Sequence, residues 1–428
     1  MTAARDATDP ALPRTDAPHG PMAPAPTTMR LTHSGVDVAH YTSMHVLGSI
    51  FPLSAGLLLY GWRALGTILV VCASTAFTLA LWRRVGRRGR HLRYDHALWL
   101  ALLLALMLPP HLLSGRDVSS FSNVVPWPIL PAAGMTLAVL LWVLGAAGSG
   151  RVHAVLVTNL LMVVLFRDLL VPHYTLQRMN LFRGDVLSAV VPPRGIIERR
   201  DAPDGDPTRG SRQPWIRQSV DALHDALYAE PASQRLVFYT TGTESPERAW
   251  VSLESLLRDR MPPLEDLIIG GQPGPIGTSS AIAVIIGGLF LLYRGLIDYR
   301  VPLLIFLTAY LCMLLLPVPL RITETEKAWH LLAVRPPPDG VGWRVGLTFV
   351  HYELMAGPLL FTAFFLATAP AVRPLSRRGR AVYAVLVGAL AAVFQLYLAV
   401  SIGPYLALLC VSLFTPLIDD MFRPRTIV

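Results

Sequence analysis

The stretch GGQPGPIGTSS, residues 270–280, runs directly into the uncharged apolar residues 281–292. Glycine and proline punctuate its first half, which excludes a regular helix or strand there. Thr278, Ser279 and Ser280 then supply side-chain oxygens at the point where a helix begins and its first N–H groups lack partners. The stretch therefore predicts a small-residue loop at membrane depth that leads into a transmembrane helix.

The same loop is a candidate binding site. Because the first N–H groups of a helix carry partial positive charge, they can hold an anion or a flavin. We therefore predict that Gly274, Gly277, Thr278 and Ser279 bind a cofactor. The alternative is an ordinary helix start at the membrane interface, and the residue types fit both interpretations equally well.

The composition identifies the class of protein. Hydrophobic residues make up 53% of the 428 residues and charged residues make up 15%, whereas a typical soluble chain has about 25% charged residues. Apolar runs of the length that spans a bilayer, roughly 20 residues, recur through the sequence. We predict an all-α polytopic membrane protein with about ten transmembrane helices and one soluble extracytoplasmic insert.

The excess of positive charge is explained by membrane topology. The formal net charge is +9, and six arginines lie within residues 83–93, between two apolar runs. Because basic residues concentrate in cytoplasmic loops, this pattern predicts a cytoplasmic loop and two cytoplasmic termini, and it does not require nucleic acid as a partner. Cys72, Cys312 and Cys410 are too scattered for a metal or redox motif, so we predict no metal site and assign them to helix packing.

The distribution of apolar runs divides the chain into five parts. Two membrane halves with five helices each are separated by a stretch that is rich in Pro, Asp, Arg and Ser. The parts are a disordered cytoplasmic tail (residues 1–29), the first membrane half (residues 30–171), the extracytoplasmic insert (residues 172–263), the second membrane half (residues 264–420) and a cytoplasmic tail (residues 421–428).

One predicted span carries an acidic residue. Residues 345–366 are mostly apolar but contain His351, Tyr352 and Glu353. Charged groups inside a span are costly and are often functional. We therefore predict that Glu353 is the catalytic group on an ion or proton path. The alternative is a helix-end residue beside the membrane interface.

Three motifs resemble one family of membrane proteins, the NqrB/RnfD family. They are PGPIGTS at residues 273–279, GPLLFTAFFLATAP at residues 357–370 and PLID at residues 416–419. Members of this family are homologous membrane components of two redox pumps, the Na+-translocating NADH:quinone reductase and the Rnf-type ferredoxin:NAD oxidoreductase. The similarity covers the chain from about residue 30 to about residue 425, and it is poorest in the insert. Ala369 replaces the aspartate that is usual in the family, so the chain resembles a divergent member.

The resemblance implies a flavin site in the insert. In the family, the threonine of an Asp-x-x-Ser-Gly-Ala-Thr-like segment is esterified to the phosphate of FMN, and TGT at residues 241–243 matches part of that segment. Glu244 stands where the acceptor threonine belongs, and a shift by one residue makes Thr243 the acceptor. Because Glu244 would repel the phosphate, we expect bound FMN to depend on Thr243, and we expect the covalent ester to be absent rather than present.

The resemblance also implies a function. The chain is expected to be a membrane subunit of a redox-driven ion-pumping electron-transport complex, a translocase that couples electron transfer through FMN or riboflavin to the movement of Na+ or H+. Its expected partners are the other membrane and peripheral subunits and the lipid bilayer, and its expected location is the bacterial cytoplasmic (inner) membrane. Two alternatives stay open, namely a flavin-free scaffold subunit of such a complex and a transporter without redox chemistry.

Overall fold

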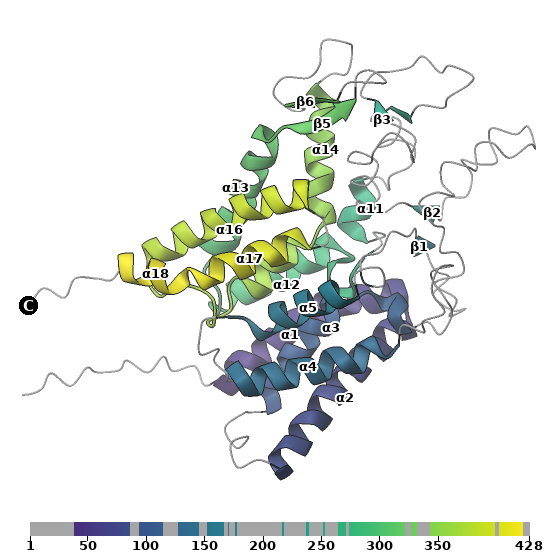
Figure 1. Ribbon diagram of the computed structural model, residues 1–428, viewed down its shortest axis with the longest axis vertical. Coiled ribbons are helices and arrows are strands. Elements are labelled where there is room, and N and C mark those ends of the chain that lie inside the picture. The colour runs from purple at the N-terminus through teal and green to yellow at the C-terminus, as the bar shows by residue number, and fades with distance from the viewer. Residues whose placement is uncertain are drawn as a thin grey trace, which may run out of the picture. The chain divides into compact units, whose positions relative to one another are not determined.

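The computed structural model (Figure 1) describes a helical bundle and several short strands. The described residues are 38–85, 94–113, 127–144, 152–166, 170, 176–177, 216–217, 237–238, 251–252, 264–270, 274–321, 327–331, 343–398 and 402–422. All of them belong to the unit Val38–Val428. The predicted N-terminal tail, most of the insert with Thr243, and most of the arginine-rich loop lie outside the described residues.

Five described helices lie within residues 30–171, the predicted first membrane half. They are α1 (Val38–Tyr60), α2 (Trp62–Val85), α3 (Tyr94–Met107), α4 (Ile129–Leu144) and α5 (Ala154–Leu165). Gly61 makes the tight turn between α1 and α2 with a φ of 61°, a left-handed conformation that glycine adopts without strain. Helix α2 packs against α3 and α4, α4 packs against α5, and α1 lies beside α3 (Figure 1).

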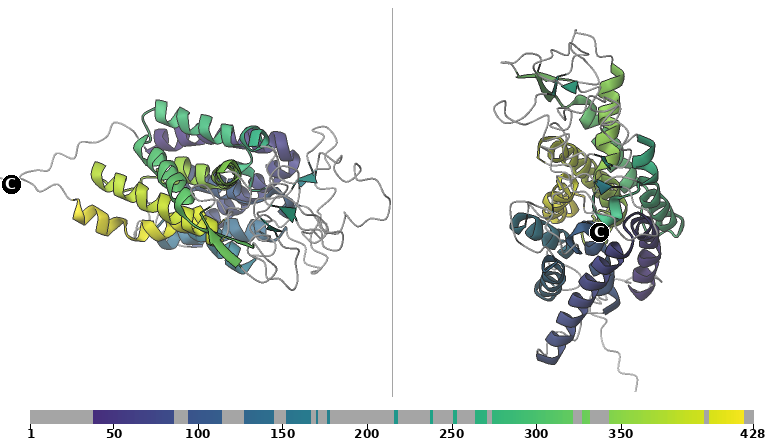
Figure 2. Two further views of the ribbon diagram at one scale, coloured as in Figure 1. Left: turned by 90° about the horizontal axis from the view of Figure 1, so that it is seen from above. Right: turned by 90° about the vertical axis from the view of Figure 1, so that its right-hand side faces the viewer.

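The second membrane half consists of longer helices that alternate with short or bent ones. They are α11 (Leu264–Ile269), the 3-10 turn η5 (Ile276–Thr278), α12 (Ala281–Tyr293), α13 (Arg300–Leu315), α14 (Trp343–Ala356), α15 (Leu359–Phe361), the π-helical turn η6 (Thr362–Leu366), α16 (Arg377–Tyr397), α17 (Gly403–Leu413) and α18 (Thr415–Met421). Helix α16 packs along α13 and α17 (Figure 2). The two halves meet where α1 packs on α12 and where α5 packs on α17.

Several of these helices can cross a membrane. Among the described residues, three are long and apolar enough to do so alone: Ala39–Tyr60, Trp62–Arg84 and Arg377–Tyr397. Two bent pairs, Trp343–Met355 with Leu359–Leu366 and Gly403–Leu413 with Thr415–Met421, raise the number to five. Large apolar side chains such as Phe77 and Val164 are exposed on the bundle, which suits a surface that faces lipid. The chain is thus a multi-pass membrane protein. The count of ten spans stays a prediction, because the five shorter apolar helices have 10–17 residues each.

Small residues let the helices approach one another closely. A Cβ on Gly287 of α12 would lie 2.5 Å from the carbonyl oxygen of Gly48 in α1, and a Cβ on Gly388 of α16 would lie 2.5 Å from that of Ile305 in α13. Neither position has room for a side chain. Since lipid tails are as apolar as leucine, membrane helices associate through close van der Waals packing of this kind.

The all-α prediction agrees with the bundle, and the part of the chain that the structure describes also holds six short strands. They are β1 (Leu176–Gln177), β2 (Ile216–Arg217), β3 (Val237–Phe238), β4 (Val251–Ser252), β5 (Val318–Arg321) and β6 (Lys327–His330). The first two form an antiparallel pair, and the others form a sheet in the order β4-β3-β5-β6. Phe238 in the insert pairs with Arg321, which follows α13. Strand β3 of the insert therefore lies beside β5, the strand that follows α13. The topology of the spans and of the insert stays a prediction.

Candidate functional site

The predicted loop begins where α11 ends and finishes at the start of α12. Gly270 follows α11 with a φ of 130°, a conformation that side chains rarely allow. Ser280 then joins the two helices. Its hydroxyl donates to the carbonyl oxygen of Ile269 (2.7 Å) and accepts from the N–H of Ala283 in the first turn of α12 (3.4 Å). The described part of the loop, Gly270 and residues 274–280, contains the 3-10 turn η5 and leads into a helix capped by Ser280.

The polar groups of Thr278 and Ser279 are used inside the loop. Thr278 Oγ1 donates to the carbonyl oxygen of Pro275 (3.2 Å), and Ser279 Oγ donates to that of Ile276 (2.9 Å). The Thr278 N–H also donates to Pro275 (3.2 Å), and the Ile276 N–H donates to Leu108 at the end of α3 (3.2 Å). These internal bonds satisfy polar groups of the loop without water.

The two glycines among the predicted binding residues differ in their surroundings. A Cβ on Gly277 would lie 2.8 Å from Leu106 Cβ and 3.3 Å from the ring of Phe361, so this position packs directly on α3 and α15. A Cβ on Gly274 would be in ordinary contact, 3.7 Å from the nearest side-chain atom. The backbone of Gly274 forms a hydrogen bond with the Tyr60 hydroxyl of α1. The loop thus connects α1, α3 and α15.

These contacts show what three of the loop residues do in the folded chain. Gly277 permits close packing, and the hydroxyls of Thr278 and Ser279 donate to the backbone carbonyl oxygens of Pro275 and Ile276. The N–H groups of Ile276 and Thr278 donate to protein carbonyl oxygens, so these two groups are not open donors for an anion. Cofactor binding by Gly274, Gly277, Thr278 and Ser279 stays a prediction.

Glu353 is completely buried, with 0% of its surface exposed. It lies on α14, and Gln395 of α16, also buried, reaches it. Gln395 Nε2 donates to the backbone carbonyl oxygen of Glu353 and lies 3.4 Å from Glu353 Oε2. A carboxyl group in an apolar interior is costly unless it is hydrogen-bonded. Glu353 is therefore enclosed by the bundle rather than exposed at a helix end. Its role on an ion path stays a prediction.

The span that carries Glu353 bends one turn after it. Helix α14 gives way to Gly357 and Pro358, and the next helical segment leaves at 52° to it. Proline has no N–H and clashes with the preceding turn, which accounts for the break. Segment α15 continues into the π-helical turn η6, and such turns are frequent at functional sites. Because Phe361 of α15 contacts Gly277, the bent span connects Glu353 to the loop.

A group of buried polar rings between α1 and α3 was not predicted from the sequence. The rings of Tyr41 and His45 lie 4.0 Å apart, and the ring of Trp99 lies 5.2 Å from that of His45. His45 has no exposed surface, and its Nδ1 lies 2.9 Å from the Tyr41 carbonyl oxygen. Among the described residues, His45 Nε2 and Trp99 Nε1 have no hydrogen-bond partner. The spacing of four residues between Tyr41 and His45 was the available signal, since it places both on one helix face.

Comparisons with known proteins agree with this architecture. A family model described as the NQR2, RnfD, RnfE family matches residues 27–428. The D subunit of an ion-translocating oxidoreductase complex from Halorhodospira halophila is 27% identical over 391 residues, which are 89% of each chain. The protein of the same name from Stutzerimonas stutzeri is 27% identical over 89% of this chain and 90% of its own. The D subunit of a Na(+)-translocating ferredoxin:NAD(+) oxidoreductase complex from Acetobacterium woodii is 30% identical over 39% of this chain and 43% of its own. Because the family model spans almost the whole sequence, this chain belongs to the NQR2, RnfD, RnfE family.

Proposed function

We propose that this chain is a membrane subunit of an ion-translocating oxidoreductase complex in the bacterial cytoplasmic membrane. In this proposal the chain holds flavin and couples electron transfer to the movement of Na+ or H+. The observation that carries the proposal is the buried carboxyl group of Glu353, which lies beside a bent span in a chain of this family. The names of its relatives support membership of a complex with several subunits.

Glu353 and Gln395 would act on the ion. A buried carboxylate can accept a proton or bind a cation, and its cost inside a membrane is tolerated where it serves transport. The Gln395 amide donates to the Glu353 backbone and holds this part of α14 against α16. The bend at Gly357 and Pro358 interrupts the helix within the same span, and interrupted helices of this kind form substrate and ion sites in transporters.

In this proposal the insert is the main binding site of the flavin, and the loop contributes further contacts. Thr243 is our proposed attachment residue for FMN, and Gly274, Gly277, Thr278 and Ser279 are our proposed contacts for FMN or riboflavin. A bound flavin would accept electrons from one carrier and pass them to the next. In this scheme the protein positions the flavin and excludes water. The internal hydrogen bonds of Thr278 and Ser279 leave their oxygens able to act only as acceptors towards such a ligand.

Visible absorption of the purified protein tests the proposal. Absorption near 450 nm is typical of oxidised flavin. We expect roughly one equivalent of flavin per chain. Precipitation with acid then separates two forms, since covalent flavin stays in the pellet and non-covalent flavin is released. Co-purification of further redox subunits from the native membrane is expected as well. A protein isolated with its partner subunits but without flavin would overturn flavin binding and favour the scaffold alternative.

A transporter without redox chemistry is the second candidate, because the buried carboxyl group and bent span would serve it equally. Ion movement into membrane vesicles distinguishes the two. The redox complex is expected to move ions only when a reduced electron donor is supplied. Ion movement that continues without a donor, and is driven by an ion gradient alone, would favour the transporter.

A further inference from the structure

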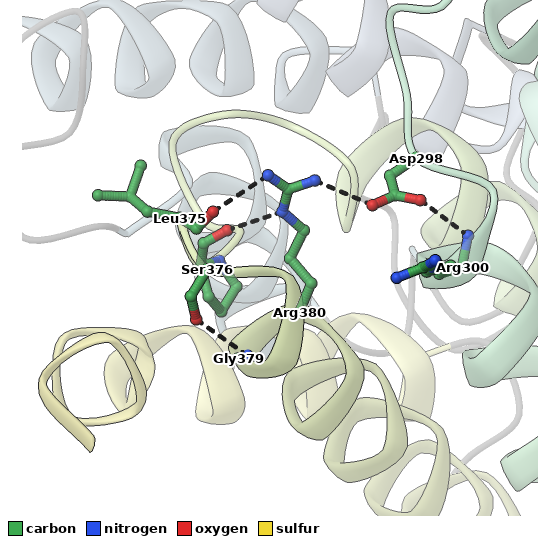
Figure 3. A network of polar contacts seen from close by, with 7 residues as sticks. Asp298, Arg300, Leu375, Ser376, Gly379 and Arg380 are labelled. Carbon is green, nitrogen blue, oxygen red and sulfur yellow. Dashed lines mark hydrogen bonds and ion pairs between the residues drawn. The ribbon is translucent and has the colours of Figure 1, made fainter. Parts of the chain in front are cut away.

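A basic pocket of about 320 Å³ lies between the turn from α12 to α13 and the start of α16. The turn contributes residues 295–300, and the other wall consists of Arg373, Arg377 and Arg380. Together with Arg300 of the turn, the lining therefore has four arginines, whereas it has one acidic residue, Asp298. Figure 3 shows Arg380 pointing from α16 towards Asp298, with Arg300 on the far side of that carboxylate. The pocket thus has an excess of positive charge, and it lies at the end of α12 and at the starts of α13 and α16.

The single carboxylate is already neutralised within the wall. Arg380 Nη1 lies 2.9 Å from Asp298 Oδ2, and the other guanidinium nitrogens of Arg380 donate to the carbonyl oxygens of Pro374 (3.2 Å) and Leu375 (3.1 Å). Asp298 Oδ1 accepts the backbone N–H of Arg300 at 3.2 Å. Arg380 and Asp298 therefore build the wall of the pocket (Figure 3), which also carries Arg300, Arg373 and Arg377.

The remaining charge in the pocket favours an anion. Arg300, Arg373 and Arg377 line it, and the side chains of Arg300 and Arg377 are exposed. Helices α13 and α16 begin at Arg300 and Arg377, so two positive helix ends meet here as well. Burial, together with the charge of Arg380, holds the pKa of Arg373 below its ordinary value. An anion that entered this pocket would relieve the repulsion among these groups, and a phosphate suits the forked guanidinium donors.

The surroundings of the pocket point to a lipid rather than a soluble phosphate. Tyr293 and Tyr299 flank it, and Tyr293 is 88% exposed. Such tyrosines mark the interface between membrane and water. Leu303 on α13 is an exposed leucine within one helical turn of Arg300, and Leu289 on α12 is an exposed leucine about two turns before Gly295. A headgroup in the pocket would thus place its acyl chains against an apolar surface.

We propose that this pocket binds the phosphate of an anionic phospholipid in the leaflet on the arginine-rich side of the membrane. Basic pockets at the ends of transmembrane helices bind such headgroups. The lipid would join the turn before α13 to the start of α16 through Arg300 and Arg377. Zwitterionic lipids also carry a phosphate, but their ammonium group cancels its charge. The pocket therefore favours a headgroup with net negative charge.

Native mass spectrometry of the full-length protein, purified with any bound subunits, tests the proposal. The protein is titrated with dioleoyl phosphatidylglycerol and, separately, with dioleoyl phosphatidylcholine. Arg300→Gln and Arg377→Gln are made singly and together. Arg378→Gln is the matched control, because Arg378 is the exposed neighbour of Arg377 on α16 but does not line the pocket. Thermal unfolding of every variant confirms that it is folded.

We expect the wild type to retain phosphatidylglycerol in preference to phosphatidylcholine. Each pocket arginine replaced should weaken binding about fivefold, and the double variant roughly twentyfold, whereas Arg378→Gln should bind like the wild type. If the double variant is unstable, Arg300→Lys and Arg377→Lys, which keep the charge, should show intermediate binding.

Four results would overturn the proposal. Equal retention of both lipids would remove the preference for net charge. Equal weakening by Arg378→Gln would show a general surface effect. Displacement of the lipid by millimolar inorganic phosphate would identify a site for a soluble anion. Loss of a bound subunit from the double variant, with unchanged lipid retention, would identify a protein-docking surface instead. None of these outcomes bears on flavin binding or ion transport, so the proposal and the proposed function are tested separately.

Discussion

Arg380 and Asp298 lie 82 residues apart in the sequence, and Arg380 Nη1 is 2.9 Å from Asp298 Oδ2 in the folded chain. The pair joins the first turn of α16 to the turn that precedes α13, and these two helices pack along each other. The two side chains are 21% and 18% exposed, so solvent screens their attraction only in part. The ion pair thus fixes the relative position of two helix ends that no local sequence feature connects.

Replacing Asp298 by Asn is expected to destabilise the protein by about 1–2 kcal/mol, because Arg380 loses a charged hydrogen-bond partner. Replacing Arg380 by Gln is expected to cost more, since its bonds to Pro374 and Leu375 disappear as well. Thermal unfolding in detergent measures both changes. Arg378→Gln is the control and should stay within about 0.5 kcal/mol of the wild type. An equal loss of stability in Arg378→Gln would mean that the net charge, and not the ion pair, determines the stability.

The loop is expected to tolerate alanine at Gly274 but not at Gly277. A Cβ on Gly277 would lie 2.8 Å from Leu106 Cβ on α3, so Gly277→Ala should cost about 1–3 kcal/mol through overpacking. Gly274→Ala should change stability by less than about 1 kcal/mol, because its nearest side-chain contact would be at 3.7 Å. Unfolding midpoints of the two variants check this difference. Similar midpoints would show that the loop can move away from α3.

Glu353→Gln is expected to slow coupled ion transport about tenfold or more while the protein still assembles. The amide keeps the size of the side chain and can still face Gln395, but it can neither carry a proton nor balance a cation. Transport is measured in membrane vesicles supplied with a reduced electron donor. Asp420→Asn, which removes an exposed carboxylate from α18, is the control. Normal transport by a well-expressed Glu353→Gln variant would assign Glu353 a structural role.

Thr243 is expected to determine whether FMN is retained. We expect the peptide of residues 236–248 to be unmodified in mass spectrometry, since Glu244 would repel an attached phosphate by about 1 kcal/mol in water at 4 Å and by more when it is partly buried. Thr243→Ala is expected to lower the flavin content even without an ester. A mass increase of one FMN on Thr243 would show that the ester forms. Unchanged flavin in Thr243→Ala would exclude this residue from the site.

Both termini are expected to lie in the cytoplasm, on the same side as the arginines of residues 83–93. A reporter that is active only in the cytoplasm should therefore work when it is fused after Val428. A second fusion within residues 172–263 should show the opposite activity. A C-terminal reporter that is active only outside the cell would contradict the model of ten spans with a cytoplasmic N-terminus.

The site was predicted unevenly, and particular residues show why. The helix start at Ser280 could be predicted, because serine caps a helix through local backbone contacts. Glu353 was singled out because a carboxyl group in an apolar run is conspicuous, and its role stays a prediction. The ring group of Tyr41, His45 and Trp99 was missed, since contact across two helices leaves little trace in either helix alone.

The sequence by itself determined the class of the protein and its apolar helices, because these follow from the length of apolar runs. It predicted residues 345–366 as one span, and the structure shows that this span bends after Glu353. Only the tertiary structure decided which helix faces meet. It brings Gln395 to Glu353, Gly277 to Leu106 and Arg380 to Asp298. The physical reason lies in the membrane. Lipid is as apolar as a helix interface, so outward and inward faces carry similar side chains and their pattern does not show which face packs.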